Sequence, residues 1–288
     1  MHRRKFIQAG GLSALAFGMP VKKLETWWTS PGKLPSFGVQ LYSVKEDMAL
    51  DPKGTIRKMA EDGYDYIESF EGKQGMFWGM TNREFKQYCD SLHLQVLASH
   101  CDETKDIERK AAEAGQIGMK YLISAWKGPQ KSIDDFKRIA EGFNKAGEIC
   151  RKNGIRFAYH NHDYPFRPVD GQLPMDVMLK NTDPELVDFE MDIYWVVTGG
   201  KDPKEYLRDY SGRFRLCHVK DRLAVPLPGN ANSSCDLGKG IIDFPSVLRV
   251  AADHGMKYYV VEQEYFPGST PLLSAAADAV YMKKFRLA

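Results

Sequence analysis

Residues 155–160 read IRFAYH, a short apolar and aromatic run that ends on a histidine. Three later segments have the same form: LVDFEMD at 186–192, RFRLCH at 213–218 and YYVVE at 258–262. Runs of this length and composition predict β-strands. They end on side chains that bind divalent metals, namely His160, Asp192, His218 and Glu262. One such residue is usually structural, but four in series predict a single metal site where the strands meet.

Strand-like runs and helical stretches alternate along the chain from residue 36 onward. Four further β-like runs lie at 36–43, 64–70, 94–100 and 120–126. Helices are expected to begin near Asp51, Asn82, Glu103, Ile133, Met175, Pro203, Phe244 and Leu272. Eight strands, each followed by a helix, in about 250 residues predict a single α/β domain, the (β/α)8 TIM barrel. A doubly wound open sheet is the alternative, but it favours a glycine-rich turn after its first strand, and VQLYSVKEDM at 39–48 has none.

The first residues, MHRRKFIQAGGLSALAFGMP, differ in character from the rest of the chain. Arg3 and Arg4 precede a mildly apolar stretch, a pattern typical of a twin-arginine export signal and too short to span a membrane. We expect residues 1–35 to be this signal and a linker, and residues 36–288 to be the barrel. The expected location is the periplasm, with a cytoplasmic protein as the alternative. Stable membrane insertion of the mature chain is not expected.

Charge is almost balanced outside this leader. The whole chain has 40 basic and 38 acidic residues, and removing Arg3, Arg4 and Lys5 leaves 37 against 38. A near-neutral body lacks the basic surface that binds nucleic acid, so no nucleic-acid partner is expected.

Strand alternation makes the proposed ligand set self-consistent. Side chains of a barrel strand point alternately to the interior and to the helices. If the four ligands point inward, their apolar neighbours face the helices: Tyr159, Met191, Cys217 and Val261. Two imidazoles and two carboxylates suit one Mn²⁺, Zn²⁺, Co²⁺ or Fe²⁺ ion better than Ca²⁺. Such an ion can polarise a sugar carbonyl and acidify the proton on the adjacent carbon, which Glu262, as ligand and candidate base, could remove.

Other strand ends and adjacent loops offer groups that suit a carbohydrate. The expected substrate-binding residues are Gln40, Tyr42, Glu68, His100, Trp126, His162 and Lys220. Aromatic rings can stack on a sugar face, although packing at the barrel top is the alternative role for Tyr42 and Trp126. A concentrated Arg/Lys cluster is missing, so free sugars or glycosides are favoured over sugar phosphates.

At these residues the chain resembles the xylose isomerase-like TIM barrels, the sugar phosphate isomerase/epimerase superfamily. The resemblance covers about residues 36–286 and depends on FGVQLYS (37–43), YHNHDY (159–164), MDIYW (191–195), CHVKD (217–221) and VVEQE (260–264). It implies one divalent metal, often Mn²⁺, held by His160, Asp192, His218 and Glu262. It also implies a metal-dependent isomerase or epimerase acting on a small-molecule carbohydrate.

His160 departs from the pattern of the family. In its ketose epimerases the ligand on the fifth strand is a glutamate that also moves protons, and the matching position here is His160. The candidate catalytic residues of this chain are His160 and Glu262. The alternative reaction is therefore that of a lyase or hydratase acting on 3-keto sugars or keto-glycosides, related to the inosose dehydratases. A non-catalytic sugar-binding module is a third hypothesis. Endonuclease IV chemistry is disfavoured because Trp195 replaces a histidine ligand of its metal cluster.

Overall fold

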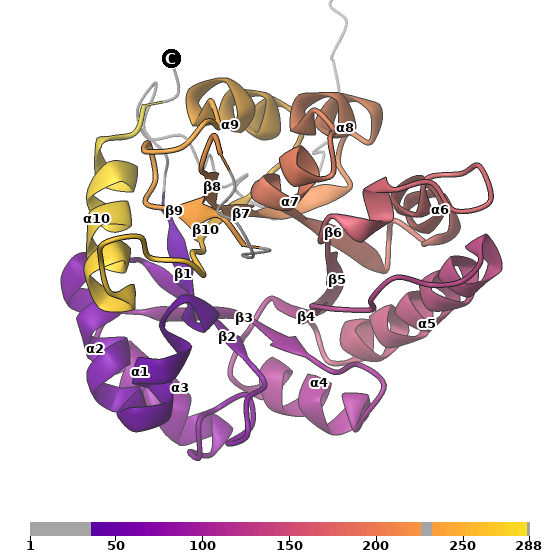
Figure 1. The fold of residues 1–288 in the computed structure, drawn as a ribbon. Helices are drawn as coiled ribbons and strands as arrows, with labels where there is room; N and C mark the ends of the chain where they lie inside the picture. The colour runs from indigo at the N-terminus through magenta and orange to yellow at the C-terminus, as the bar shows by residue number, and fades with distance from the viewer. Residues whose placement is uncertain (1–35, 226–231, 287–288) are drawn as a thin grey trace, which may run out of the picture.

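The computed structural model describes residues 36–225 and 232–286 (Figure 1). Eight parallel strands close into a barrel in the order β1-β10-β7-β6-β5-β4-β3-β2. The predicted (β/α)8 barrel is therefore confirmed. The predicted export signal and linker at 1–35 lie outside the described residues.

Each predicted β-run contains one barrel strand. The strands are β1 (Gly38–Gln40), β2 (Tyr66–Phe70), β3 (Gln95–Cys101), β4 (Tyr121–Ser124), β5 (Arg156–His160), β6 (Val187–Asp192), β7 (Phe214–Val219) and β10 (Tyr258–Val261). In register, Asp192 is paired with His218, and His160 with Glu190. Parallel pairing thus brings the carboxyl ends of these strands to one rim, where barrel enzymes hold their active sites.

Helices surround the barrel (Figure 1). They are α1 (Lys45–Leu50), α2 (Pro52–Asp62), α3 (Asn82–Ser91), α4 (Ile107–Gln116), α5 (Ile133–Lys152), α6 (Pro174–Asn181), α7 (Ile193–Thr198), α8 (Pro203–Asp209), α9 (Phe244–Asp253) and α10 (Pro271–Lys284). Seven of the eight predicted starts lie within one residue of an observed start. The exception is α4, which begins at Ile107 and not near Glu103, because Asp106 has a φ of 49° and breaks the helical backbone just before it. No helix among the described residues has the length and apolar character to span a membrane.

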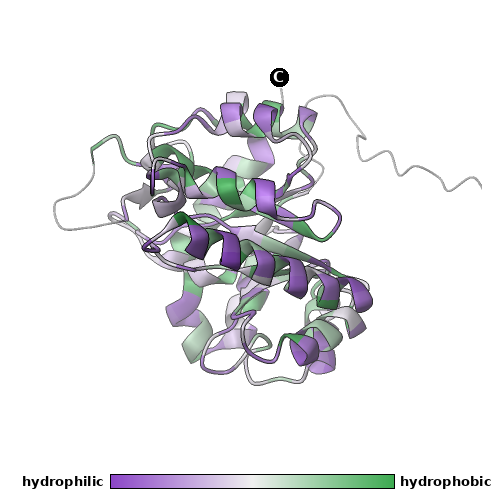
Figure 2. Cartoon of the chain, turned by 90° about the vertical axis from the view of Figure 1, so that its right-hand side faces the viewer, coloured by the Kyte–Doolittle hydropathy of each residue, from purple (hydrophilic) through white to green (hydrophobic). Residues whose placement is uncertain are grey.

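The helices bury one apolar face against the strands. On α5 the buried residues recur every three or four positions, and Phe143 packs 5.5 Å from Phe157 of β5 between ring centres. In Figure 2 the helices carry both hydrophilic and hydrophobic residues, as this packing requires.

The lower barrel interior is filled by a second apolar group, here called the apolar layer. Its members are Tyr66, Leu97, Ala98, Tyr121, Ile123, Ala158, Leu216 and Val260. Three of them precede a predicted ligand by two positions, so the same strand face turns from apolar to polar as it reaches the rim.

A short antiparallel pair follows the barrel strand β7 and was not predicted. It joins β8 (Asp221–Arg222) to β9 (Ser234–Cys235). Asp221 Oδ2 accepts hydrogen bonds from the backbone of Gly238 and Gly240, both at 2.9 Å. These contacts hold the chain that follows β9 against Asp221 of β8.

Candidate metal-binding active site

The four predicted ligands converge at the carboxyl end of the barrel. One donor atom from each of His160, Asp192, His218 and Glu262 lies within 4.8 Å of the others, and all four residues are buried. Asp192 Oδ2 has no hydrogen-bond partner among the described residues, and it lies 3.8 Å from His160 Nε2 and 3.9 Å from His218 Nδ1. A buried carboxylate oxygen needs a partner. Donors that share an ion at about 2.0–2.2 Å lie a few ångströms apart, so the set fits a divalent metal.

A second group of donors overlaps the first and shares His160 and His218 with it. It consists of His100, His160, Glu190 and His218, again with donor atoms within 4.8 Å. Glu190 was not predicted as a site residue. The alternation rule could have found it, because Glu190 lies two positions before Asp192 on β6 and therefore points to the same interior. The two groups together with Glu68 form the polar layer of the barrel interior.

Each histidine of the ligand set has one ring nitrogen within hydrogen-bond distance of a carboxylate outside that set. His160 Nδ1 lies 3.2 Å from Glu190 Oε2, and His218 Nε2 lies 2.8 Å from Glu68 Oε1. Carboxylates accept hydrogen bonds, so they favour the ring tautomer that carries its proton on the nitrogen facing them. His160 Nε2 then directs its lone pair toward Asp192 Oδ2, whereas His218 Nδ1 lies 3.1 Å from Glu262 Oε2 and 3.9 Å from Asp192 Oδ2. Metal-binding histidines are commonly oriented in this way.

His100 and Gln40 complete this support. His100 Nε2 lies 3.0 Å from Glu68 Oε1 and 2.9 Å from Glu190 Oε2, and so joins the two carboxylates. Gln40 Nε2 donates to Glu68 Oε1 at 2.7 Å. Burial alone would lower the pKa of His100, but the charges and hydrogen bonds of Glu68 and Glu190 outweigh it and raise the pKa to about 9. The imidazolium then neutralises part of the negative charge that the two carboxylates bring into the barrel.

Burial shapes the protonation of the ligands themselves. It lowers the pKa of His160 well below its usual value, with repulsion from His218 adding to the effect. It raises the pKa of Asp192 to about 7, although Lys220 opposes the shift. For Glu262, burial would raise the pKa, but the charges of Lys220 and His218 outweigh it and hold the pKa well below its usual range. Neutral His160 and ionised Glu262 are the forms that bind metal.

Lys220 is buried beside the ligands rather than exposed in the cavity. Its Nζ donates to Glu262 Oε2 at 3.2 Å and also to Glu264, and it lies 3.8 Å from Asp192 Oδ2. The ammonium also lies 5.1 Å from the ring centre of Trp195. These contacts fix the orientation of Glu262 and keep it ionised.

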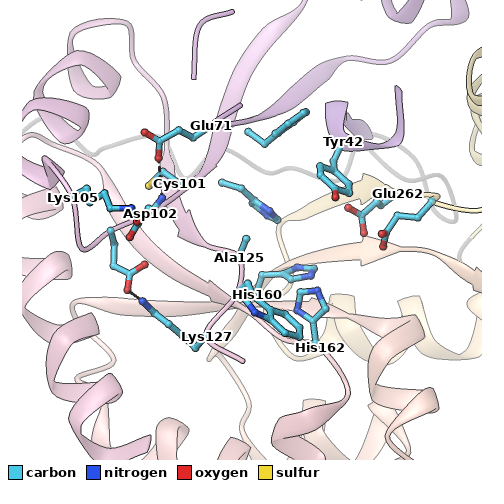
Figure 3. A pocket seen from close by; sticks show the side chains of 15 residues that line it. Tyr42, Glu71, Cys101, Asp102, Lys105, Ala125, Lys127, His160, His162 and Glu262 are labelled. Atoms are coloured by element: carbon cyan, nitrogen blue, oxygen red, sulfur yellow. Dashed lines mark hydrogen bonds and ion pairs between the residues drawn. The ribbon is translucent and has the colours of Figure 1, made fainter. Parts of the chain in front are cut away.

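A cavity of about 740 Å³ opens above the ligands (Figure 3). Four of the predicted substrate-binding residues line it: Tyr42, His100, Trp126 and His162. The other three, Gln40, Glu68 and Lys220, are fully buried and belong to the support of the ligands. Their sequence positions place them inward, but the depth of each strand below the rim depends on barrel closure. The substrate-binding role of all seven stays a prediction.

Comparison with known proteins places this geometry in a family. A family model described as xylose isomerase-like TIM barrel matches residues 56–285. The chain belongs to this family. It is similar to a solved sugar phosphate isomerase/epimerase from Parabacteroides distasonis, with 29% identity and a TM-score of 0.74, over 86% of this chain and 97% of that one.

Two further relatives are informative. An inosose dehydratase from Clostridium perfringens is 28% identical over 165 residues, which cover 52% of this chain and 55% of the relative. The chain thus spans about half the length of this curated relative. The solved IOLI protein with a bound zinc atom has 14% identity and a TM-score of 0.67, over 86% of this chain and 95% of that one, which shows a shared fold.

Proposed function

We propose that this protein is a divalent-metal-dependent carbohydrate isomerase or epimerase, with Mn²⁺ as the ion and Zn²⁺, Co²⁺ or Fe²⁺ as alternatives. The observation that carries the proposal is the convergence of four buried donors at the floor of an open cavity. The mixed nitrogen and oxygen set suits such ions. When bound, the ion would polarise a carbonyl of the sugar.

The residues of the chain supply the proton chemistry. Glu262 lines the cavity and is held ionised by Lys220, so it can take the proton from the carbon beside the carbonyl. His162 also lines the cavity, and its Nδ1 has no hydrogen-bond partner in residues 36–225 and 232–286. Burial, with a smaller contribution from the charge of Lys220, lowers its pKa to about 3, so the ring is neutral. Return of a proton to the opposite face of the same carbon completes an epimerisation. Return to the neighbouring carbon, with a proton moved between the two oxygens, completes an isomerisation.

Solvent-deuterium exchange tests this proposal. The Mn²⁺-loaded protein is incubated in D₂O with a panel of keto-sugars, and deuterium on carbon is detected by NMR. We expect incorporation into at least one sugar and its loss on chelation or in Glu262→Gln. Absence of bound ion in metal analysis, together with activity that survives chelation, would refute it. A sugar-binding module would instead show no exchange and an unchanged sugar affinity in Glu262→Gln.

A lyase or hydratase acting on 3-keto sugars or keto-glycosides is the second candidate. It is supported by His160, which stands where the ketose epimerases have a second proton-moving carboxylate, and by the partial match to inosose dehydratases. Here Glu262 would remove the proton and the neighbouring carbon would lose its leaving group. Incubation with 3-keto-glucosides, followed by ultraviolet detection of an unsaturated ketone, separates the two reactions.

Export is proposed on the sequence of the leader alone. Residues 1–35, fused to a reporter, are expected to direct it to the periplasm of a host with the twin-arginine pathway. Cytoplasmic retention of the reporter would favour a cytoplasmic protein. Export that persists after Arg3→Lys and Arg4→Lys together would contradict the twin-arginine route.

A further inference from the structure

We propose that the cavity has two subsites, and that the substrate is a neutral glycoside whose second sugar unit occupies the one distant from the ligands. This inference rests on the proposed function for the subsite at the ligands. The distal subsite is defined by Glu71, Asp102, Glu103, Lys105 and Lys127, all of which line the cavity.

The cavity is built from two sides of the barrel. The distal residues follow β2, β3 and β4. On the other side, His160 is the last residue of β5, His162 lies two residues beyond it, and Glu262 follows β10. Figure 3 shows this separation, with Glu71, Asp102, Lys105 and Lys127 on the left and His160, His162 and Glu262 on the right. The cavity therefore extends across the barrel mouth, away from the ligand set.

Its size exceeds what one sugar ring requires. The volume of about 740 Å³ lies in the upper part of the range of ~300–1,000 Å³ of pockets that enclose drug-sized ligands. A single pyranose ring is much smaller than such a ligand. A ring bound at Glu262 would leave the distal side filled only with water.

Charge pairing at the distal subsite selects a neutral group. Lys105 pairs with Asp102 at 2.8 Å, and Lys127 pairs with Glu103. Glu71 in turn accepts from the buried Lys110 at 2.6 Å. Each lysine of the distal subsite thus already has a carboxylate partner. A phosphate or carboxylate group would meet three acidic side chains, whereas sugar hydroxyls can both donate to and accept from such pairs.

An aromatic ring marks the junction of the two subsites. Trp126 is 57% exposed although it lines the cavity. Its ring contacts His162 edge-on, with 4.6 Å between ring centres, while its chain neighbour Lys127 belongs to the distal subsite. The indole also packs at 5.0 Å from Tyr164, which holds it in place. Its open surface offers the apolar face of a sugar a stacking partner between the two ends.

Calorimetry on the full, Mn²⁺-loaded protein tests the proposal. The probes are maltose, cellobiose, lactose and trehalose, with glucose, galactose and glucose 6-phosphate for comparison. We expect at least one disaccharide to bind roughly tenfold or more tightly than either of its units. Glucose 6-phosphate should bind no more tightly than glucose. Equal affinity for all disaccharides and their units, or preference for the phosphate, would overturn the proposal.

Variants of the distal pairs localise the effect. Glu103→Gln and Asp102→Asn should each weaken the preferred disaccharide roughly tenfold, while monosaccharide affinity changes less than about twofold. The matched control is Glu113→Gln, which breaks an exposed 2.8 Å pair with Arg109 on α4 and should change neither affinity. Circular dichroism checks the fold of each variant.

Different results would overturn the two-subsite cavity and the proposed function. If the distal variants lose affinity for disaccharide and monosaccharide in parallel but keep Mn²⁺ binding and deuterium exchange, the two-subsite proposal is overturned and the proposed function is not. A protein that binds no Mn²⁺ and exchanges no deuterium would instead refute the proposed function.

Discussion

The apolar layer and the polar layer of the barrel interior lie on the same strands, but their burial has opposite effects on the stability of the fold. Ala158, Leu216 and Val260 fill the lower half, and two residues later the same strands present His160, His218 and Glu262. Burial of the first set stabilises the fold, with about 25 cal/mol gained per Å² of apolar surface removed from water. Burial of the second set costs desolvation.

The polar layer is satisfied mainly by its own members. Hydrogen bonds join His100, His160 and His218 to the carboxylates beneath them. Three carboxylate oxygens nevertheless have no hydrogen-bond partner in the part of the chain that the structure describes: Glu68 Oε2, Glu190 Oε1 and Asp192 Oδ2. Such oxygens cost stability when they are buried without a hydrogen bond, and a divalent ion held by the polar layer would offset part of this cost.

The largest expected effect is the loss of chemistry when the base is neutralised. Glu262→Gln keeps the shape of the side chain but removes the charge that takes the proton. We expect the deuterium exchange rate in the preferred keto-sugar to fall by roughly 10²–10⁴-fold. Thermal unfolding should show a folded protein. A rate within a few-fold of wild type would exclude Glu262 as the base.

A substitution in the apolar layer should lower the free energy of unfolding without changing the affinity for metal. Leu216→Ala removes a fully buried side chain two residues from His218 and should lower the free energy of unfolding by about 2–5 kcal/mol. Urea unfolding measures the loss, and titration with Mn²⁺ should give an affinity close to wild type. A large loss of Mn²⁺ affinity with little loss of stability would show that the two layers are not separable.

Glu190 supports a predicted metal ligand without belonging to the ligand set His160, Asp192, His218 and Glu262. Glu190→Gln should weaken Mn²⁺ binding about 10–100-fold, since His160 loses the carboxylate that orients it.

The matched control for Glu190→Gln is Asp188→Asn on the same strand. Asp188 accepts from Arg156 at 2.9 Å and from Tyr121 at 2.8 Å, below the polar layer. Asp188→Asn should lower the free energy of unfolding and leave the Mn²⁺ affinity unchanged. Equal effects of the two variants on metal affinity would contradict the assigned role of Glu190.

The smallest expected change is in the pH dependence of stability, and it comes from Asp278, a buried carboxylate outside the barrel interior. Asp278 accepts a hydrogen bond from the backbone of Leu237 at 2.7 Å, and burial raises its pKa well above the usual value. The stability that it contributes is therefore fully present below its unfolded pKa, about 3.9, and is lost as pH rises through the higher folded value. Asp278→Asn should gain stability relative to wild type as pH rises from 4 to 8 in urea unfolding. A pH-independent difference would contradict this.

Sequence patterns predicted which side chains face the barrel interior better than they predicted how deep in the interior each side chain lies. The eight β-runs and most helix starts follow from periodicity and from caps such as Thr81, whose side chain accepts from Glu84 at the start of α3. The convergence of the four ligands follows from alternation. Alternation cannot say that Gln40 and Glu68 lie beneath the cavity, because their depth depends on how the closed barrel staggers its strands. Glu190 could have been predicted, whereas the β8–β9 pair depends on long-range contacts of Asp221.

Titration of the metal-free protein with Mn²⁺ measures directly whether the four strand ends bind an ion. We expect one ion per chain, an increase in the midpoint of thermal unfolding on binding, and loss of both in Asp192→Ala, which removes the buried oxygen that lacks a hydrogen bond. Leu216→Ala should still bind one ion. Absence of Mn²⁺ binding in the wild type, or binding that is unchanged in Asp192→Ala, would contradict a metal site at these four strand ends.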